Sequence, residues 1–210
     1  MKKSLTKNIV SWVLSLLMIG AGVALVASFF LAGNLNSIAT NSENPGGFNV
    51  PRLAAAGAAA ASGPEDKTLK LSVPRMSQIE DDTVPTVRGT DTQTLGAHAA
   101  IHLAGTGFPW EEDSNVYLAG HRLGYPRTDS FLAFFDLDKL EMGDQVYLTD
   151  ANGTRYTYEV FKELVVSPTD LSVTEPVEGK NIVTLQTCTL PDYSQRLIVQ
   201  AELVNTTTQS

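Results

Sequence analysis

The sequence predicts a mostly β domain, folded as a closed or nearly closed barrel of about eight strands with one or two short helices, behind a single N-terminal transmembrane helix. Three observations support this fold class. Residues 9–32 form an apolar run that contains no charged residue. Several shorter stretches alternate apolar and polar residues, which is the pattern of half-buried strands. A hairpin signal, Asn152-Gly153, separates two of these stretches.

Length, charge and cysteine content narrow the possible functions. The chain has 210 residues, a formal net charge of −8 and a single cysteine. This length allows one domain of about 150 residues with appendages. One cysteine excludes an internal disulfide framework, so packing must hold the fold together. The acidic composition argues against nucleic acid as a partner.

The N-terminal segment has the features of a membrane anchor. As a helix, residues 9–32 would extend about 36 Å at about 1.5 Å per residue, which is enough to cross a bilayer. Lys2, Lys3 and Lys7 precede this run, and no lysine or arginine follows it directly. We therefore expect residues 1–8 in the cytoplasm and the rest of the chain outside the cell membrane. A cleaved signal peptide is the alternative, although its apolar core usually has only about 7–15 residues.

The remaining chain divides by composition. Residues 33–67 are rich in Asn, Ser, Gly, Pro and Ala and poor in the large apolar residues that a core needs. We expect them to form a flexible extracellular linker. Residues 68–205 then form the barrel domain, and residues 206–210 form a short tail.

The first half of the domain predicts short elements. Thr68–Val73 alternates apolar and polar residues and is expected to be a strand. Ile79–Arg88 is acidic and contains a proline, which favours a loop or an edge strand. Thr94–Leu103 predicts one or two helical turns. Asn115–Ala119 is an apolar strand that ends at Gly120, directly before a histidine.

The second half predicts a helix followed by strands. Ser130–Leu140 has apolar residues at 131, 132, 134, 135, 137 and 140, which favours a short helix. Gln145–Thr149 and Thr154–Val166 are expected to be strands, joined by a type I′ turn at Asn152-Gly153.

The C-terminal third adds a long connection and two strands. Ser167–Lys180 is expected to be an exposed connection that could contact a substrate. Asn181–Cys188 and Arg196–Val204 are expected to be the last two strands.

The single cysteine and one histidine are candidates for catalysis. Cys188 ends a short apolar run, and Arg196 opens the next strand, so a thiol nucleophile could lie beside a positive charge. The alternative is that Cys188 is a small buried core residue. His121 follows a strand and a glycine, a position where catalytic groups are often displayed. The alternative is an ordinary surface histidine.

The segment Thr184-Leu185-Gln186-Thr187-Cys188 resembles the Thr-Leu-x-Thr-Cys signature of sortases, the cysteine transpeptidases of Gram-positive cell surfaces. Ala119-Gly120-His121-Arg122 resembles the segment that bears the family's histidine, and Arg196 falls where the family's arginine opens the final strand. The resemblance covers about residues 68–204. This histidine segment, together with the Cys-Thr-x-Pro continuation after the signature, is most similar to the class D and E housekeeping-type enzymes.

The resemblance implies a sortase-like barrel and a role for each site residue. Cys188 would attack a peptide carbonyl and carry the acyl group as a thioester. His121 would be the general acid and base, and Arg196 would stabilise the oxyanion or hold the substrate. Leu185, Thr187 and His102 are candidate substrate-binding residues.

The resemblance also implies partners and no cofactor. The substrates would be surface proteins with a C-terminal Leu-x-x-Thr-Gly-like sorting signal, cut between Thr and Gly. The acceptor would be an amine of a peptidoglycan precursor or of another protein. A pilin-polymerising sortase, a cysteine peptidase that uses water, and a non-catalytic peptide-binding module remain alternatives. Pilin-assembling sortases often carry an Asp-Pro-aromatic lid, and this tripeptide does not occur in the sequence.

Other candidate sites in the sequence have simpler interpretations. His98 and His102 are four residues apart and could join His121 in a zinc site, but no accompanying glutamate completes the zinc peptidase motif. Acidic residues on two loops show no calcium-loop pattern. We therefore expect no metal. Residues 103–107 spell Leu-Ala-Gly-Thr-Gly, itself a possible sorting signal, but a turn is the expected structure.

Overall fold

The structure, a computed structural model, describes residues 63–88 and 91–208. The predicted membrane span at 9–32 and most of the predicted linker lie outside these residues. Within the described ranges, no helix has the length and apolar character needed to cross a membrane. The elements are β1 (Leu69–Ser72), β2 (Asp82–Val84), β3 (Thr86–Val87), α2 (Thr92–Ala97), β4 (Ile101–Leu103), β5 (Asn115–Ala119), the 3₁₀ helix η1 (Leu137–Lys139), β6 (Gln145–Thr149), β7 (Thr154–Val166), the 3₁₀ helix η2 (Ser172–Thr174), β8 (Ile182–Cys188) and β9 (Arg196–Thr208).

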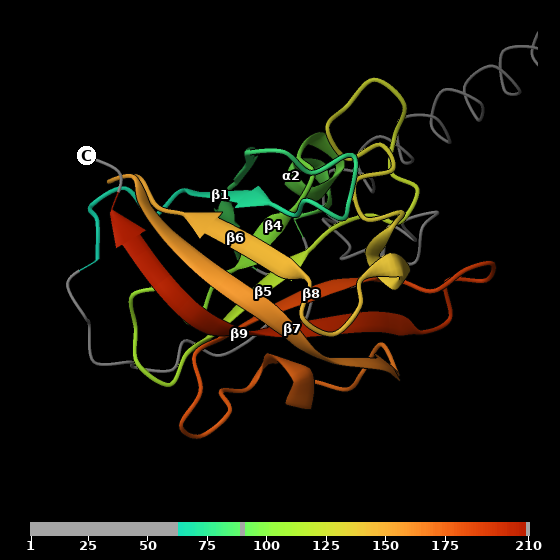
Figure 1. The fold of residues 1–210 in the computed structure, drawn as a ribbon. Helices are drawn as coiled ribbons and strands as arrows, with labels where there is room; N and C mark the ends of the chain where they lie inside the picture. Colours follow the sequence, from blue (N-terminus) through green and yellow to red (C-terminus); the bar gives the residue numbers. More distant parts are fainter. Residues whose placement is uncertain (1–62, 89–90, 209–210) are drawn as a thin grey trace, which may run out of the picture. The chain divides into compact units, whose positions relative to one another are not determined.

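The strands of the described chain form one nine-stranded sheet in the order β2-β1-β6-β7-β9-β8-β5-β4-β3 (Figure 1). β2 and β3 lie at opposite ends of this order, yet only Pro85 separates them in the sequence. The sheet must therefore curl until its two edges meet at this proline. The backbone N–H of His102 in β4 donates to the Pro85 carbonyl at 2.9 Å, which ties the junction to the second edge. The result is the nearly closed barrel that the sequence predicts.

The longest pairing of the barrel joins β7 and β9. It runs from Thr154 opposite Thr208 to Val166 opposite Arg196, with two register shifts on the way. β6 and β7 have the bounds predicted from their alternation. β9 continues to Thr208, beyond the boundary at residue 205 that the sequence predicts for the domain.

The core lies on the inner face of the sheet. Alternate residues of six strands and of the segments that close the barrel form it, and most are completely buried: Leu69, Leu71, Val116, Leu118, Val146, Leu148, Tyr156, Tyr158, Val183, Leu185, Val199 and Ala201, with Phe134 and Leu137 at one end. A second, smaller cluster lies on the outer face of β4, β5, β8 and β9 and includes Cys188, Tyr117 and Ile198. Leu95 of α2 and Val173 of η2 cover it.

The predicted helix at Ser130–Leu140 is wrong. This segment consists of turns and ends in η1. Leu132 has a φ of +57°, which a right-handed helix does not allow. The backbone N–H groups of Leu132 and Phe134 donate to the carbonyls of Leu123 and His121, at 2.9 and 3.1 Å, and are therefore not available for helical bonds.

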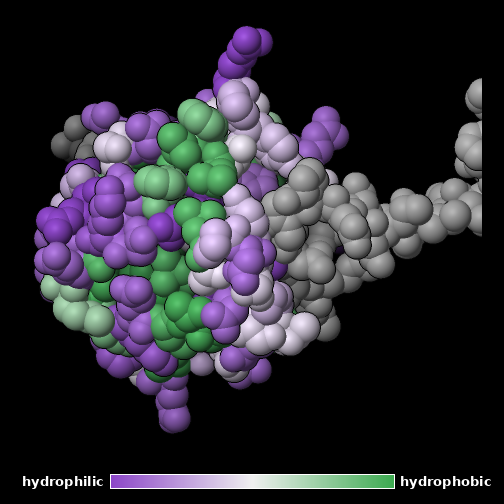
Figure 2. Space-filling model, turned by 90° about the vertical axis from the view of Figure 1, so that its right-hand side faces the viewer, coloured by the Kyte–Doolittle hydropathy of each residue, from purple (hydrophilic) through white to green (hydrophobic). Residues whose placement is uncertain are grey.

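Large apolar side chains on this segment and on the loop before it remain on the surface. Leu123, Tyr125, Phe131 and Phe135 are each about two-fifths exposed. Figure 2, seen from the right-hand side of Figure 1, shows apolar residues gathered among hydrophilic ones on that side of the domain. A predicted apolar helix face thus became a partly exposed loop.

Two other predictions, the helix at Thr94–Leu103 and the turn at Asn152-Gly153, differ from the structure. The helix expected at Thr94–Leu103 is α2, which ends at Ala97, because Ile101 and His102 pair with β5 as part of a strand. Of Asn152-Gly153, only Gly153 has a positive φ, so the turn is not type I′. The Asp150 carboxylate accepts the N–H groups of Asn152 and Thr154, both at 2.9 Å, and organises a longer loop instead.

Candidate active site

The barrel brings three predicted residues to the same end of three adjacent strands. β5 runs parallel to β8, with Ala119 opposite Gln186, so His121 follows β5 at the level where Cys188 ends β8. β9 runs antiparallel to β8, and its first residue, Arg196, is the direct partner of Cys188. Cys188, His121 and Arg196 are each at least 95% buried.

Gly120 lets the chain turn from β5 into the site. Its N–H donates to the Gln186 carbonyl at 3.0 Å, and its carbonyl accepts the Thr187 hydroxyl at 2.9 Å. A Cβ at this position would lie 2.7 Å from the Phe134 ring and 2.8 Å from the Ala99 carbonyl oxygen. Only glycine fits this space without a shift of its neighbours. The position of His121 is therefore fixed by close packing around Gly120.

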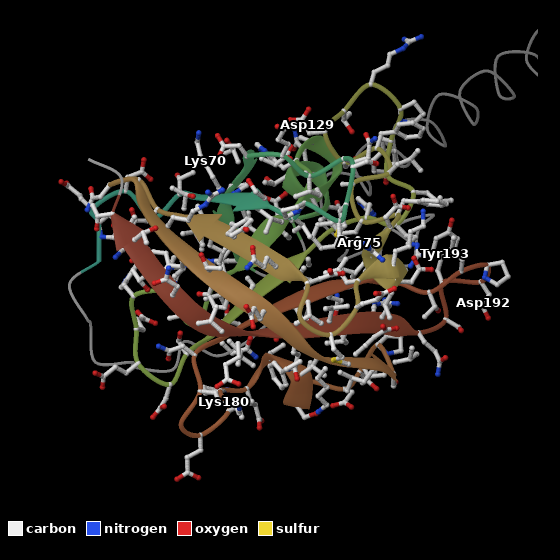
Figure 3. All side chains as sticks on the ribbon, in the orientation of Figure 1. Lys70, Arg75, Asp129, Lys180, Asp192 and Tyr193 are labelled. Atoms are coloured by element: carbon white, nitrogen blue, oxygen red, sulfur yellow. The ribbon has the colours of Figure 1, made fainter. Side chains whose placement is uncertain are left out.

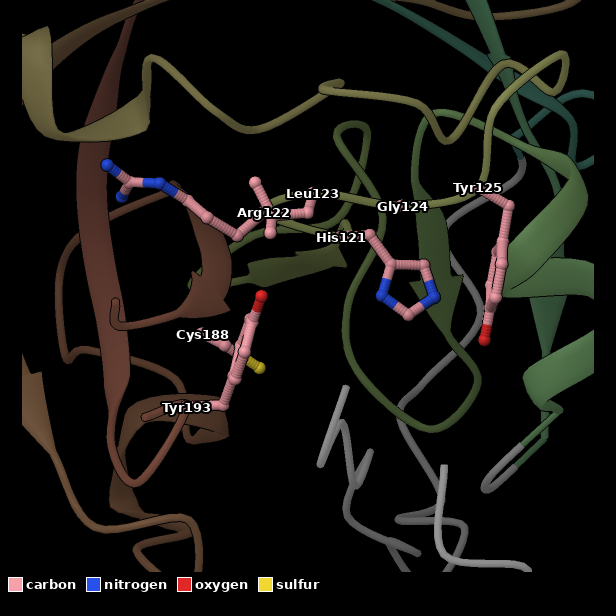
Figure 4. A pocket seen from close by; sticks show the side chains of 7 residues that line it. All are labelled: His121, Arg122, Leu123, Gly124, Tyr125, Cys188 and Tyr193. Carbon is pink, nitrogen blue, oxygen red and sulfur yellow. The ribbon is translucent and has the colours of Figure 1, made fainter. Parts of the chain in front are cut away.

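A small pocket opens beside Cys188. Its lining residues are His121, Arg122, Leu123, Gly124, Tyr125, Cys188 and Tyr193, and its volume is about 210 Å³. This is less than the roughly 300–1,000 Å³ of pockets that enclose a drug-sized ligand, so it suits one residue of an extended peptide. In Figure 4, the Tyr193 ring lies beside the Cys188 sulfur, whereas His121 and Tyr125 lie on the other side. The His121 and Tyr125 rings meet edge to face at 5.4 Å.

Burial sets the charge states of the two reactive groups. It raises the pKa of the Cys188 thiol above its usual value, and the nearby Arg196 charge partly opposes this shift. Burial also lowers the pKa of the His121 imidazole. Both shifts favour neutral forms, because a low-dielectric environment disfavours charge. At neutral pH these directions favour a neutral thiol and a neutral imidazole.

Arg196 also organises the loop between β8 and β9. Its Nη1 donates to the carbonyls of Tyr193 and Gln195, each at 3.1 Å. Tyr193 has a φ of +57°, an unusual value for a bulky residue, which costs about 1–3 kcal/mol. Figure 3 labels Tyr193 and Asp192 on this loop, where it projects beyond the strands. The arginine therefore holds a strained backbone next to the nucleophile.

A buried polar network continues from the site along the outer face of the sheet. The Tyr117 hydroxyl donates to the Gln186 side-chain oxygen, and the Thr184 hydroxyl donates to the Asn115 side-chain oxygen at 2.8 Å. The Asn115 amide donates in turn to the carbonyls of Val173 and Glu175, at 3.0 and 2.9 Å. These bonds fasten the connection between β7 and β8 over the outer face.

Three predicted substrate-binding residues do not line the pocket. Leu185 lies in the inner core, and the buried Thr187 side chain donates a hydrogen bond to the Gly120 carbonyl. His102 is completely buried, and burial lowers its pKa to about 4. Its Nδ1 contacts the Thr86 hydroxyl and its Nε2 contacts the Gly107 carbonyl, both at 3.0 Å. These three residues support the barrel around the site.

Sequence patterns missed the aromatic walls of the pocket. Tyr125 and Tyr193 lie in loops, where no periodic pattern marks a functional side chain. The one usable signal was position, because Tyr193 lies between Cys188 and Arg196 in the sequence. Within residues 63–88 and 91–208, no three His, Cys, Asp or Glu side chains are grouped as a metal site requires.

Comparison with known proteins gives consistent matches. The family model described as the sortase domain matches residues 71–204, more than half of the chain. Sortase A of Streptococcus agalactiae serotype III (strain NEM316) is 37% identical over 93 residues, which are 44% of this chain and 37% of that protein. The chain thus matches well under half of the length of its curated relatives.

Solved structures are similar over about two thirds of the chain. Sortase C of Streptococcus pneumoniae, studied for its catalysis and pilin substrate specificity, aligns with a TM-score of 0.56 and 26% identity over 65% of each chain. Sortase A of Corynebacterium diphtheriae aligns with a TM-score of 0.56 and 29% identity, over 67% of this chain and 61% of that one.

Proposed function

The chain belongs to the sortase family, and we propose that it is a membrane-anchored cysteine transpeptidase. It cleaves a Leu-x-x-Thr-Gly-like sorting signal between Thr and Gly and transfers the acyl group to an amine of the cell wall. The observation that carries this proposal is the meeting of Cys188, His121 and Arg196 at one end of three adjacent strands. The apolar run at 9–32 supports the anchor and an extracellular catalytic domain.

The first half of the reaction forms a thioester. The Cys188 thiol transfers its proton to His121, and the thiolate attacks the carbonyl carbon of the threonine. Burial makes this ion pair a minor form, but the Arg196 charge favours it by lowering the thiol pKa. The imidazolium then protonates the departing glycine nitrogen, and the C–N bond breaks.

The second half of the reaction returns the enzyme to its starting state. An incoming amine attacks the thioester carbon, and His121 takes the proton that the amine loses. The C–S bond breaks, and the Cys188 thiolate recovers its proton from the imidazolium. A guanidinium can donate hydrogen bonds to the oxyanion formed in each half, which is the role proposed for Arg196.

Within the family, we propose a class D or E housekeeping-type enzyme, on the basis of Ala119-Gly120-His121-Arg122 and the Cys-Thr-x-Pro continuation. A pilin-polymerising activity is the second candidate, because sortase C, a protein with pilin specificity, is among the similar solved structures. The acceptor separates the two: a peptidoglycan amine supports the first, and a lysine side chain of a protein subunit supports the second.

The test uses the full-length chain in detergent with Leu-Pro-x-Thr-Gly and Leu-Ala-x-Thr-Gly peptides, with and without an added amine. Mass spectrometry is expected to show a thioester on Cys188 and an amide product that depends on the amine. Cys188→Ala is expected to lose both products while staying close to the wild-type melting temperature, because it removes a single sulfur atom from a packed cluster. Retained turnover in this variant would contradict the proposal.

A further inference from the structure

Tyr193 is strained and yet firmly held. Its φ of +57° lies in the left-handed region, which bulky side chains rarely adopt. Its N–H donates to the Thr189 carbonyl at 3.1 Å, and its carbonyl accepts Arg196 Nη1 at 3.1 Å. A second pair of bonds between Thr189 and Gln195 closes the loop around it. Strain that the surroundings enforce so fully is a reason to look for a function.

The left-handed backbone conformation of Tyr193 goes together with an aromatic ring that lies beside the proposed nucleophile, Cys188. Tyr193 packs against the outer cluster that contains Cys188, and it is part of the pocket lining. In the view of Figure 4 its ring lies next to the Cys188 sulfur, and His121 lies on the other side of that sulfur. With Tyr125 beside His121, the reactive pair lies between two tyrosines. A glycine or asparagine would adopt the same backbone with less strain, but neither would supply this wall.

We propose that Tyr193 is a positioning residue that directs the acyl-enzyme toward the amine and away from water. The inference rests on the proposed transpeptidase function. The ring fixes the acyl group against Cys188 and leaves the thioester carbon open only on the side of His121. There, an acceptor that binds in the pocket mouth displaces water as it arrives.

Two reactions compete for the same carbon. An amine forms a C–N bond, breaks the C–S bond and gives an amide with the Cys188 thiol restored. Water forms a C–O bond, breaks the same C–S bond and gives a carboxylic acid with the thiol restored. In both reactions His121 takes a proton from the attacking group and returns it to sulfur. Without the Tyr193 ring, the space beside the thioester would hold several waters, at about 30 Å³ each, within reach of this chemistry.

The test measures the ratio of amide to acid product in the full-length chain over a range of amine concentrations. Tyr193→Phe keeps the ring and is expected to keep the wild-type ratio. Tyr193→Ala and Tyr193→Gly remove the ring, and a several-fold lower ratio is expected for both. Tyr193→Gly also relieves the backbone strain, so it is expected to melt at or above the wild-type temperature while becoming more hydrolytic.

A matched control separates the effect of relieving backbone strain from the effect of removing the ring. Asp113 also has a positive φ, of +47°, but it lies in the loop before β5 and outside the pocket lining. Asp113→Gly is expected to relieve strain without changing the product ratio. An unchanged ratio in both Tyr193→Ala and Tyr193→Gly would overturn the proposal, as would an equal loss in Tyr193→Phe. Failure of the proposed function has a different signature, which is that the wild-type chain forms no thioester with any peptide.

Discussion

The two faces of β8 have different roles, although both are buried: one packs in the core, and the other carries polar groups. On the inner face, Val183 and Leu185 pack into the barrel core. On the outer face, Thr184, Gln186 and Cys188 carry polar groups and the proposed nucleophile. Burying polar groups is costly unless they are hydrogen-bonded, and the Tyr117 and Asn115 side chains supply such bonds here. The packed inner face of β8 thus holds the strand in place, while the outer face presents the proposed nucleophile.

The largest expected effect is a loss of stability when a side chain on the inner face of β8 is truncated. Leu185 is completely buried, so Leu185→Ala should lower the free energy of unfolding by about 2–5 kcal/mol through lost burial and a residual cavity. Denaturant unfolding measures this loss. The rate of thioester formation per folded molecule should change little, because Leu185 does not line the pocket. A selective loss of activity with unchanged stability would contradict the division between the faces.

A substitution at Gly120, where the chain leaves β5 and enters the active site, should lower both the stability of the domain and the rate of thioester formation. A Cβ on Gly120 meets the Phe134 ring and a backbone carbonyl at less than 3 Å. Gly120→Ala should therefore cost about 1–3 kcal/mol of stability through overpacking. It should also slow thioester formation by displacing His121. Gly143→Ala is a suitable control for the change of residue type, since its Cβ would meet no atom within 4 Å, although its φ of +90° adds local strain. Equal rates of thioester formation in the two variants would argue against this role of Gly120.

The smallest effect concerns pH and involves only the outer face. The His121 pKa lies below its ordinary value of 6.5, and the Cys188 pKa lies above 9.0. The active pair shares one proton, so activity is lost at acidic pH when His121 is protonated and at basic pH when Cys188 is deprotonated. We therefore expect the acidic midpoint of the kcat/KM profile to lie below pH 6.5 and the basic midpoint to lie above pH 9.0.

Alkylation of Cys188 provides an independent measurement of this titration, because the chain has no other cysteine. The alkylation rate follows the thiolate and should still be rising at pH 9.0. A decline of kcat/KM that begins well below pH 9.0, or an alkylation rate that levels off near neutral pH, would contradict the assigned shifts.

β6 and β7 were predictable because the alternation of apolar and polar residues within each strand is a local pattern. The inner face of β7 contains Tyr156, Tyr158 and Val160. The segment 130–140 was not predictable in this way. Its apolar spacing fits a helix, but its N–H groups bond to residues 121 and 123, a long-range pairing that no local pattern encodes.

The candidate site divides in the same way. Cys188 and Arg196 could be found because one ends and the other begins a predicted strand, and His121 because it follows a predicted strand and a glycine. A barrel brings such strand ends together. The role proposed for Tyr193 could not be predicted, because it depends on a positive φ and on bonds from Arg196 that only the three-dimensional structure shows. Leu185, Thr187 and His102 were named as candidate substrate-binding residues; all three are buried, and none of them lines the pocket.

The junction at Pro85 has a consequence for how the protein behaves among copies of itself. Sheet edges offer unpaired backbone groups on which another chain can add a strand, and this is a common route to aggregation. Here the terminal strands have only three and two residues, and the proline between them has no N–H to donate. The proposed membrane anchor would concentrate the domain at a membrane surface, where it would meet its neighbours often. Such short, interrupted edges give them little on which to assemble.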